Sequence, residues 1–229
     1  MIRTILSSVA ILSVTTSQLV AKELHLGYET FCLPSHYDTL DLTKGSLFTM
    51  IGLDDEPHRG SFQFFIPAVE VKQAIKSYNA KNGEFEANLK VNVMMSNSFE
   101  QERVTSPNYH ADVLRLSESY SEASIEHDEE LGVYRVSSFS SPPPFIIWHT
   151  LSQQPFLTRA IPDKLDDYYL GYCSSSQAVP GGSSGTSCDY NIADGDFLIE
   201  VGTSEENLLL QNELTSFVKR RLNELKHEC

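Results

Sequence analysis

The chain has 229 residues, of which 41% are hydrophobic and 21% charged, a composition too apolar for a disordered protein and sufficient for one domain core. Its 31 acidic and 17 basic residues give a net charge of -14, which argues against nucleic acids and anionic membrane surfaces as partners, because both select Lys and Arg. After residue 20 the sequence contains no apolar run of the roughly 18 residues that a membrane helix needs.

The N-terminus has the pattern of a secretory signal peptide. Arg3 supplies a positive start, residues 4–16 form an uncharged apolar stretch, and the small residue Ala21 closes the segment. A buried N-terminal helix is the alternative interpretation. The pattern predicts a signal peptide over residues 1–21, a single domain over residues 22–229, and a soluble periplasmic or secreted protein.

The four cysteines, an even number, predict two disulfides in an exported chain, and three pairings are open. Cys173 and Cys188 flank a loop rich in Ser and Gly, and a bond between them would limit the entropy of that loop. Cys32 and Cys229 lie near the two ends of the exported chain, which otherwise fray. We therefore favour Cys173–Cys188 and Cys32–Cys229. The sequence contains no Cys-x-x-Cys pair, the spacing that would indicate a zinc site.

Alternation of apolar and polar residues predicts several strands. It is clearest over residues 85–95, where one face is apolar and the other polar, as in an antiparallel sheet with one buried face. A helix is expected from Pro67 to about Ala80, and Asp194-Gly195 is a good hairpin turn. The other expected strands are residues 62–66, 132–139, 145–151, 189–192 and 197–201.

The longest helix is expected at the C-terminus, over residues 204–227. Thr203 and Glu206 have the spacing of a capping box, and apolar residues recur every three or four positions from Leu210 to Leu225. Together these elements predict an α+β fold, with an antiparallel β-sheet packed by a long C-terminal helix and one or two shorter helices.

Patterns that carry chemistry in other proteins are explained here more simply by structure. Residues 181–185 fit the G-x-S-x-G pattern of serine hydrolases, in which the Ser lies on a tight turn between a strand and a helix. Here segments of small residues, typical of a loop, lie on both sides of the pattern, and no helix is expected after it. Residues 189–200 approach a calcium-binding loop, but Ala193 replaces a ligand and the flanks alternate as strands. The seven His residues have no metal-ligand spacing. We therefore predict no catalytic residue, no metal site, no cofactor and no enzyme.

One acidic segment is a candidate binding surface. If residues 116–131 are helical, Glu118, Glu122, Glu126 and Glu130 share one face, each four positions from the next. An ordinary solvated face or a mobile acidic loop is the alternative interpretation. The functional interpretation is a stripe presented to a cationic surface.

The signal pattern, the acidic charge, the size and the C-terminal pattern Cys173…Cys188…Asn207-Leu208 before a terminal helix point to one group of proteins. In these features the chain resembles the periplasmic immunity proteins that bacteria keep against type VI secretion effectors. The resemblance implies a protein that binds and neutralises a cognate protein toxin by occlusion. It implies no nucleic acid and no membrane insertion, and a partner of complementary, basic charge.

Two other functions remain open on the sequence. An envelope module for a small molecule or glycan could use the aromatic residues Trp148, Tyr168, Tyr169 and Tyr172 for stacking. An exported hydrolase with dispersed catalytic residues would show no motif. Trp148 lies in an apolar run, so we expect it in the core or, as an aromatic anchor, in a partner interface.

Overall fold

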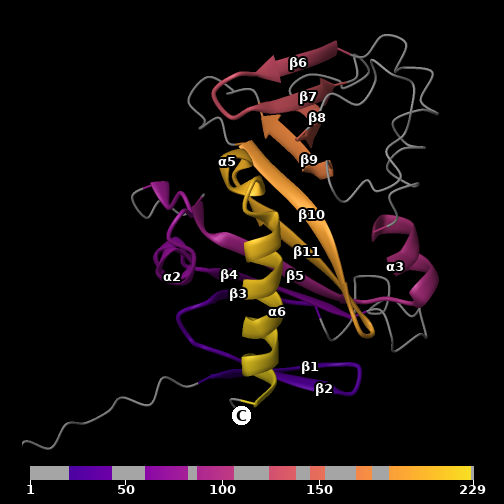
Figure 1. Ribbon diagram of the computed structural model, residues 1–229. Coiled ribbons are helices and arrows are strands. Elements are labelled where there is room, and N and C mark those ends of the chain that lie inside the picture. The colour runs from indigo at the N-terminus through magenta and orange to yellow at the C-terminus, as the bar shows by residue number, and fades with distance from the viewer. Residues whose placement is uncertain are drawn as a thin grey trace, which may run out of the picture.

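The fold is built around a large antiparallel sheet. The computed structural model describes residues 21–42, 60–81, 87–105, 124–137, 145–152, 169–176 and 186–227. Within these residues a nine-stranded sheet has the order β3-β4-β5-β11-β10-β9-β8-β7-β6, with every neighbouring pair antiparallel (Figure 1). The strands are β3 (Asp38–Asp41), β4 (Ser61–Ile66), β5 (Leu89–Met95), β6 (Ser124–Asp128), β7 (Val133–Ser137), β8 (Phe145–Leu151), β9 (Tyr169–Ser176), β10 (Thr186–Asp194) and β11 (Phe197–Thr203).

Alternation along the central strands separates a buried face from a more exposed one. In β4 the side chains of Phe62, Phe64 and Ile66 are fully buried, whereas the residues between them are partly exposed. β5 and β11 follow the same pattern, and their registers place Val93 opposite both Phe62 and Ile199. Aligned apolar residues on one face of several strands form a continuous surface that a helix can cover.

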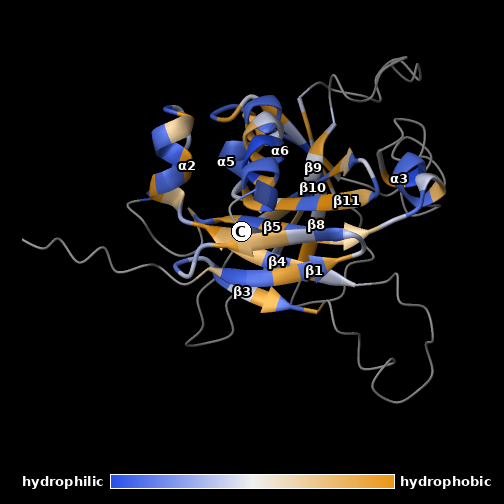
Figure 2. Ribbon diagram, turned by 90° about the horizontal axis from the view of Figure 1, so that it is seen from below, coloured by the Kyte–Doolittle hydropathy of each residue, from blue (hydrophilic) through white to orange (hydrophobic). Residues whose placement is uncertain are grey.

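The helices cover that buried face. α2 (Ala68–Ala74), α5 (Glu205–Leu208) and α6 (Gln211–His227) lie on one side of the sheet, and α3 (Ser98–Thr105) lies at its end (Figure 2). The stripe of α6 that enters the core is Leu214, Phe217, Val218, Leu222 and Leu225. The predicted α+β fold, with one long C-terminal helix and shorter ones, is confirmed.

The C-terminal helix differs from the prediction at its start. A turn at Leu209 separates α5 from α6, and Thr203 ends strand β11 instead of taking part in a capping box. The interruption has a clear cause in Asn207, whose side chain accepts from the N–H of Asn79 at 2.8 Å and donates to its carbonyl at 3.1 Å. These bonds hold the first turn against the chain after α2, and α6 then starts at Gln211.

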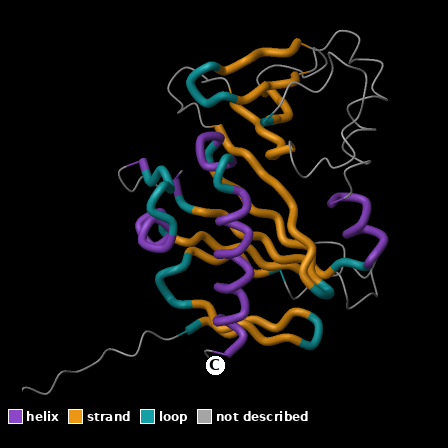
Figure 3. The backbone as a smooth tube through the Cα atoms, in the orientation of Figure 1, coloured by secondary structure: helices purple, strands orange, loops and turns teal. Residues whose placement is uncertain are grey.

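A small hairpin that the sequence patterns did not predict closes the other end of α6. β1 (Lys22–Leu26) and β2 (Glu29–Leu33) form a separate two-stranded sheet that packs beside the C-terminal end of α6 (Figure 3). The ammonium group of Lys226 lies 5.5 Å from the ring centre of Phe31 and 5.1 Å from that of Phe197. Such cation–π contacts anchor the last turn of the helix.

The remaining predictions of elements were confirmed with changes in length. The helix after Pro67 ends at Ala74, six residues earlier than expected at Ala80, and the strand expected at 132–139 spans Val133–Ser137. The predicted hairpin turn between β10 and β11 is present. None of the described helices is long and apolar enough to cross a membrane.

Candidate functional site

The acidic segment considered above as a possible helix is a β-hairpin where the structure describes it. Glu126 lies on β6 and Glu130 in the turn between β6 and β7, so the condition of a helix over 116–131 is not met from residue 124 onward. Glu118 and Glu122 lie outside the described residues. The four-residue spacing of the glutamates therefore does not create a common helical face in this part of the chain.

Asp128 shapes the turn of this hairpin, which we call the acidic hairpin (residues 124–137). Its Oδ1 accepts the backbone N–H groups of Glu130 and Leu131, both at 3.0 Å, and its carbonyl accepts the N–H of Gly132 at 2.8 Å. Gly132 has φ +67°, a conformation that favours glycine. The backbone N–H of Leu131, with help from the charge of Arg135, lowers the pKa of Asp128 below its ordinary value.

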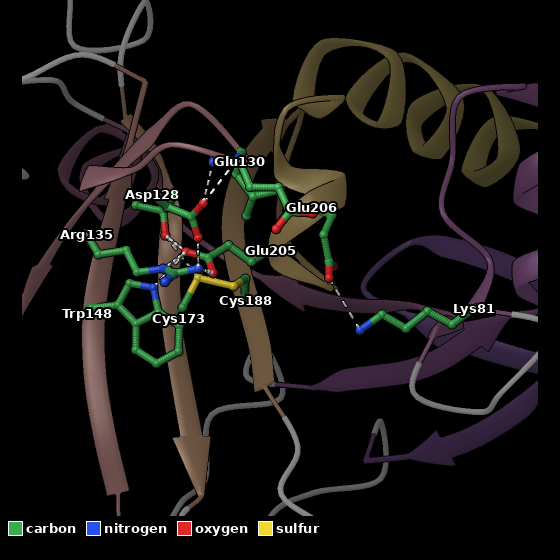
Figure 4. A network of polar contacts seen from close by, with 11 residues as sticks. Lys81, Asp128, Glu130, Arg135, Trp148, Cys173, Cys188, Glu205 and Glu206 are labelled. Carbon is green, nitrogen blue, oxygen red and sulfur yellow. Dashed lines mark hydrogen bonds and ion pairs between the residues drawn. A yellow bond between two sulfur atoms is a disulfide. The ribbon is translucent and has the colours of Figure 1, made fainter. Parts of the chain in front are cut away.

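A buried carboxylate anchors the hairpin to the helical layer. Glu205, the first residue of α5, is 6% exposed. Its carboxylate accepts hydrogen bonds from Arg135 Nε at 2.9 Å and Nη2 at 2.7 Å, from Trp148 Nε1 at 2.9 Å, and from Thr150 Oγ1 at 2.9 Å (Figure 4). We call Glu205, Arg135, Trp148 and Thr150 the Glu205 cluster. Because three side chains donate hydrogen bonds to the carboxylate of Glu205, its buried charge is satisfied.

Arg135 connects this cluster to the turn of the hairpin. Its guanidinium holds Glu205 and also lies 2.7 Å from Asp128 Oδ2. The hydrogen bonds with Glu205 raise the pKa of Arg135 above its ordinary value, and the charge of Asp128 adds to the effect. The same guanidinium lies 5.9 Å from the centre of the Trp148 ring. One side chain on β7 thus fixes the hairpin turn relative to β8 and α5.

Trp148 lies in the core, which is one of the two positions expected for it, and a direct contact with a partner stays a prediction. The indole is 8% exposed, and its N–H is used by Glu205. In this position it is a core residue that supports the hairpin, and it offers no stacking face to a glycan. Of the other aromatic candidates, Tyr172 is 38% exposed, the Tyr169 hydroxyl lies 3.1 Å from His149 Nδ1, and Tyr168 lies outside the described residues.

The disulfide between Cys173 and Cys188 is confirmed and lies next to the cluster. It joins β9 to β10 at directly paired positions, and both residues are fully buried. Trp148 pairs with Cys173 across β8 and β9, and Thr150 Oγ1 lies 3.2 Å from Cys173 Sγ. Cys32 also takes part in a disulfide, but its predicted partner, Cys229, lies outside the described residues.

The outer surface of the acidic hairpin carries mostly uncompensated negative charge. Its residues include four carboxylates, those of Glu126, Asp128, Glu129 and Glu130, against the one guanidinium of Arg135. The side chains of the three glutamates are exposed, and Arg135 is already engaged by Asp128 and Glu205. The hairpin therefore presents a fixed group of carboxylates to solvent.

The segments that resemble metal and hydrolase sites in the sequence can be compared with the structure where it describes them. These residues contain no group of three or more His, Cys, Asp or Glu side chains that could hold a metal ion. In the calcium-loop-like segment, Lys219 Nζ lies 3.4 Å from Asp194 Oδ1 and donates to the carbonyl of Ala193 at 3.0 Å, so a lysine occupies the turn. The G-x-S-x-G segment, residues 181–185, lies outside the described residues.

Comparison with known proteins gives one distant match. No family profile and no curated protein matches the chain. Among solved structures, the chain is similar to Smlt3025, described as an immunity protein of the Stenotrophomonas maltophilia type IV secretion system, with a TM-score of 0.41 and 10% identity over 91% of this chain and 93% of that one. The system named there is type IV, so the type VI assignment implied by the sequence resemblance stays a prediction.

Proposed function

We propose that this chain is an exported protein that binds and neutralises a protein toxin with a basic surface, using the acidic hairpin as part of its binding face. Inhibition would occur by occlusion, so the chain itself needs no catalytic residue. An origin in a type VI secretion immunity system, as the sequence resemblance implies, belongs to the same proposal. Of the predicted stripe, Glu126 and Glu130 are the described members, and both lie in the acidic hairpin.

The observation that carries this proposal is the rigid support beneath exposed charge. Glu205 is buried and holds Arg135 with two guanidinium nitrogens, and Arg135 holds Asp128 at the turn. Carboxylates on a freely moving loop would lose conformational entropy on binding, whereas carboxylates on a fixed hairpin avoid that loss. A solvated surface with no partner does not require such support.

The net charge of the chain supports the same conclusion. At a net charge of -14, the protein repels other acidic molecules and attracts a basic one over a distance of roughly 8 Å at physiological salt. Charges at the rim of an interface mainly increase the association rate and select the partner. The acidic hairpin would therefore contribute more to the speed and selectivity of binding than to its lifetime.

The test begins with capture of the partner. We expect the exported chain to begin at Lys22, which a measurement of its intact mass checks. This protein is crosslinked in an envelope extract, and its partners are identified by mass spectrometry. The identified partner is then expressed in the periplasm of a test strain, with and without this chain. We expect the partner alone to stop growth and the pair to grow normally.

A charge-matched pair of variants then tests the hairpin. Glu126→Lys with Glu130→Lys should slow association with the captured partner by about tenfold at low salt and less at high salt. The control, Glu102→Lys with Glu213→Lys, makes the same change of net charge at exposed positions on α3 and α6. Equal association rates for the two double variants would contradict a specific role for the hairpin. Normal growth when the partner is expressed alone would contradict neutralisation altogether.

A further inference from the structure

Among the described residues, the acidic hairpin forms the last two strands at one edge of the sheet. β6 is the last strand in the order, and it pairs only with β7 among the described residues. In an edge strand, alternate residues direct their N–H and C=O groups away from the sheet, where another strand can bind them. Figure 1 shows β6 at the end of the sheet farthest from the β1–β2 hairpin.

β6 lacks several of the features that prevent strand addition. Sheet edges are commonly protected by charged side chains, especially Lys, by Pro or by a bulge. Residues 124–128 contain no Lys, Pro or bulge, and their charged side chains, Glu126 and Asp128, are both negative, so they would repel an acidic strand and attract a basic one. The register with β7 is continuous over all five residues, from Ser124 opposite Ser137 to Asp128 opposite Val133. Ile125 is 43% exposed, so the strand also presents an apolar side chain at its edge.

We propose that the toxin binds by adding an extended basic segment to β6 as a tenth strand of this sheet. This inference rests on the proposed function and specifies how the partner is engaged. Main-chain hydrogen bonds along the edge would supply affinity, and the side chains at alternate positions would supply specificity.

The side chains of β6 indicate the chemistry of that segment. Glu126 and Ile125 point to opposite faces because successive residues of a strand alternate. A Lys or Arg opposite Glu126 and an apolar residue opposite Ile125 would each form a favourable cross-strand pair. The carboxylates of Glu129 and Glu130, in the adjacent turn, would attract further basic residues beyond the end of the strand.

The Glu205 cluster makes this edge a preformed template. Arg135, which pairs with Glu126 across β6 and β7, is held by the buried carboxylate of Glu205. The edge therefore keeps its extended shape before binding, and little ordering is required of this chain when a strand is added.

The experiment uses the full exported chain and a synthetic probe. The probe is a capped peptide of alternating Lys and Val, and its control carries N-methyl groups on every second amide, which removes the donors along one edge. We expect the unmodified peptide to slow hydrogen exchange at alternate amides of β6 by at least about tenfold, as seen by NMR, and the N-methylated peptide to leave them unchanged. Glu126→Lys should weaken the binding of the unmodified peptide.

Two outcomes would overturn strand addition. In the first, both peptides bind equally and shift only the signals of Glu129, Glu130 and their neighbours, which indicates attraction by charge alone. In the second, neither peptide changes the hydrogen exchange of β6 at about 1 mM, a concentration at which even weak binding to the strand edge would be detected. Neither result bears on neutralisation, which the growth test decides separately.

Discussion

Replacing Glu205 with Ala should destabilise the protein far more than the same replacement of an exposed acidic residue. The substitution removes the acceptor of the buried Trp148 N–H, which costs about 1–3 kcal/mol, and two charge-assisted bonds from Arg135, which cost about 1.5–3 kcal/mol. Thr150 retains a contact with Cys173 Sγ at 3.2 Å, so its share is small. We expect the free energy of unfolding to fall by about 4 kcal/mol, in the range known for breaking buried ion pairs.

The neighbouring residue provides a matched control. Glu206 is partly exposed and lies 3.8 Å from Lys81, so Glu206→Ala should cost less than about 1 kcal/mol. Both variants are measured by urea unfolding followed by circular dichroism. The fluorescence of Trp148, the only tryptophan, reports separately whether its ring becomes solvated. Equal losses in the two variants would refute the argument that Glu205 anchors the hairpin.

Three further predictions follow from the same part of the structure. Replacing Cys173 and Cys188 with Ala should lower the free energy of unfolding by about 3 kcal/mol, as expected for a 15-residue loop, in parallel urea titrations. Gly202→Ala should destabilise by about 1–3 kcal/mol in the same assay, because its Cβ would lie 2.5 Å from Lys90 Cε and 2.7 Å from Asp189 Oδ1, and the 2.6 Å ion pair of these two residues would have to shift. Because the pKa of Asp128 is lowered in the folded protein, its carboxylate stabilises the fold at pH values above its pKa in the unfolded chain, about 4. This stabilisation is lost as the pH falls through the lower pKa of the folded state. Hydrogen exchange of the hairpin should therefore accelerate in acid in the wild type, and Asp128→Asn should make that exchange fast already at neutral pH.

The strands that the sequence predicted correctly are those whose pattern is local. Phe62, Phe64 and Ile66 alternate with less buried residues, and the period of two holds in any sheet that buries one face. The acidic segment left the helix as an open possibility because glutamates four residues apart also suit a helix. A signal for a turn was present in Asp128 and Gly132, which are residue types common in turns.

The Glu205 cluster could not be predicted from the sequence because its members lie far apart along the chain. Arg135 and Glu205 are 70 residues apart, and Glu205 alone reads as an ordinary acidic residue that suits a helix N-terminus. Only the packing of β7, β8 and α5 brings the groups together. A partial signal existed in Trp148, because a tryptophan in an apolar run needs an acceptor for its N–H. That requirement does not say which acceptor is used.

The position of β11 in the middle of the sheet has a consequence for the order in which the protein can fold. β11 pairs with β5 on one side and β10 on the other, so Val93 and Ile199, more than a hundred residues apart, become neighbours. Until residues 197–203 have been synthesised, β3–β5 and β6–β10 have no strand between them. Pairing over such a distance is slow, because a long loop must close before any contact forms. The two parts of the sheet should thus join late, after almost the whole chain has been synthesised, even though β3–β5 and β6–β10 can each pair earlier.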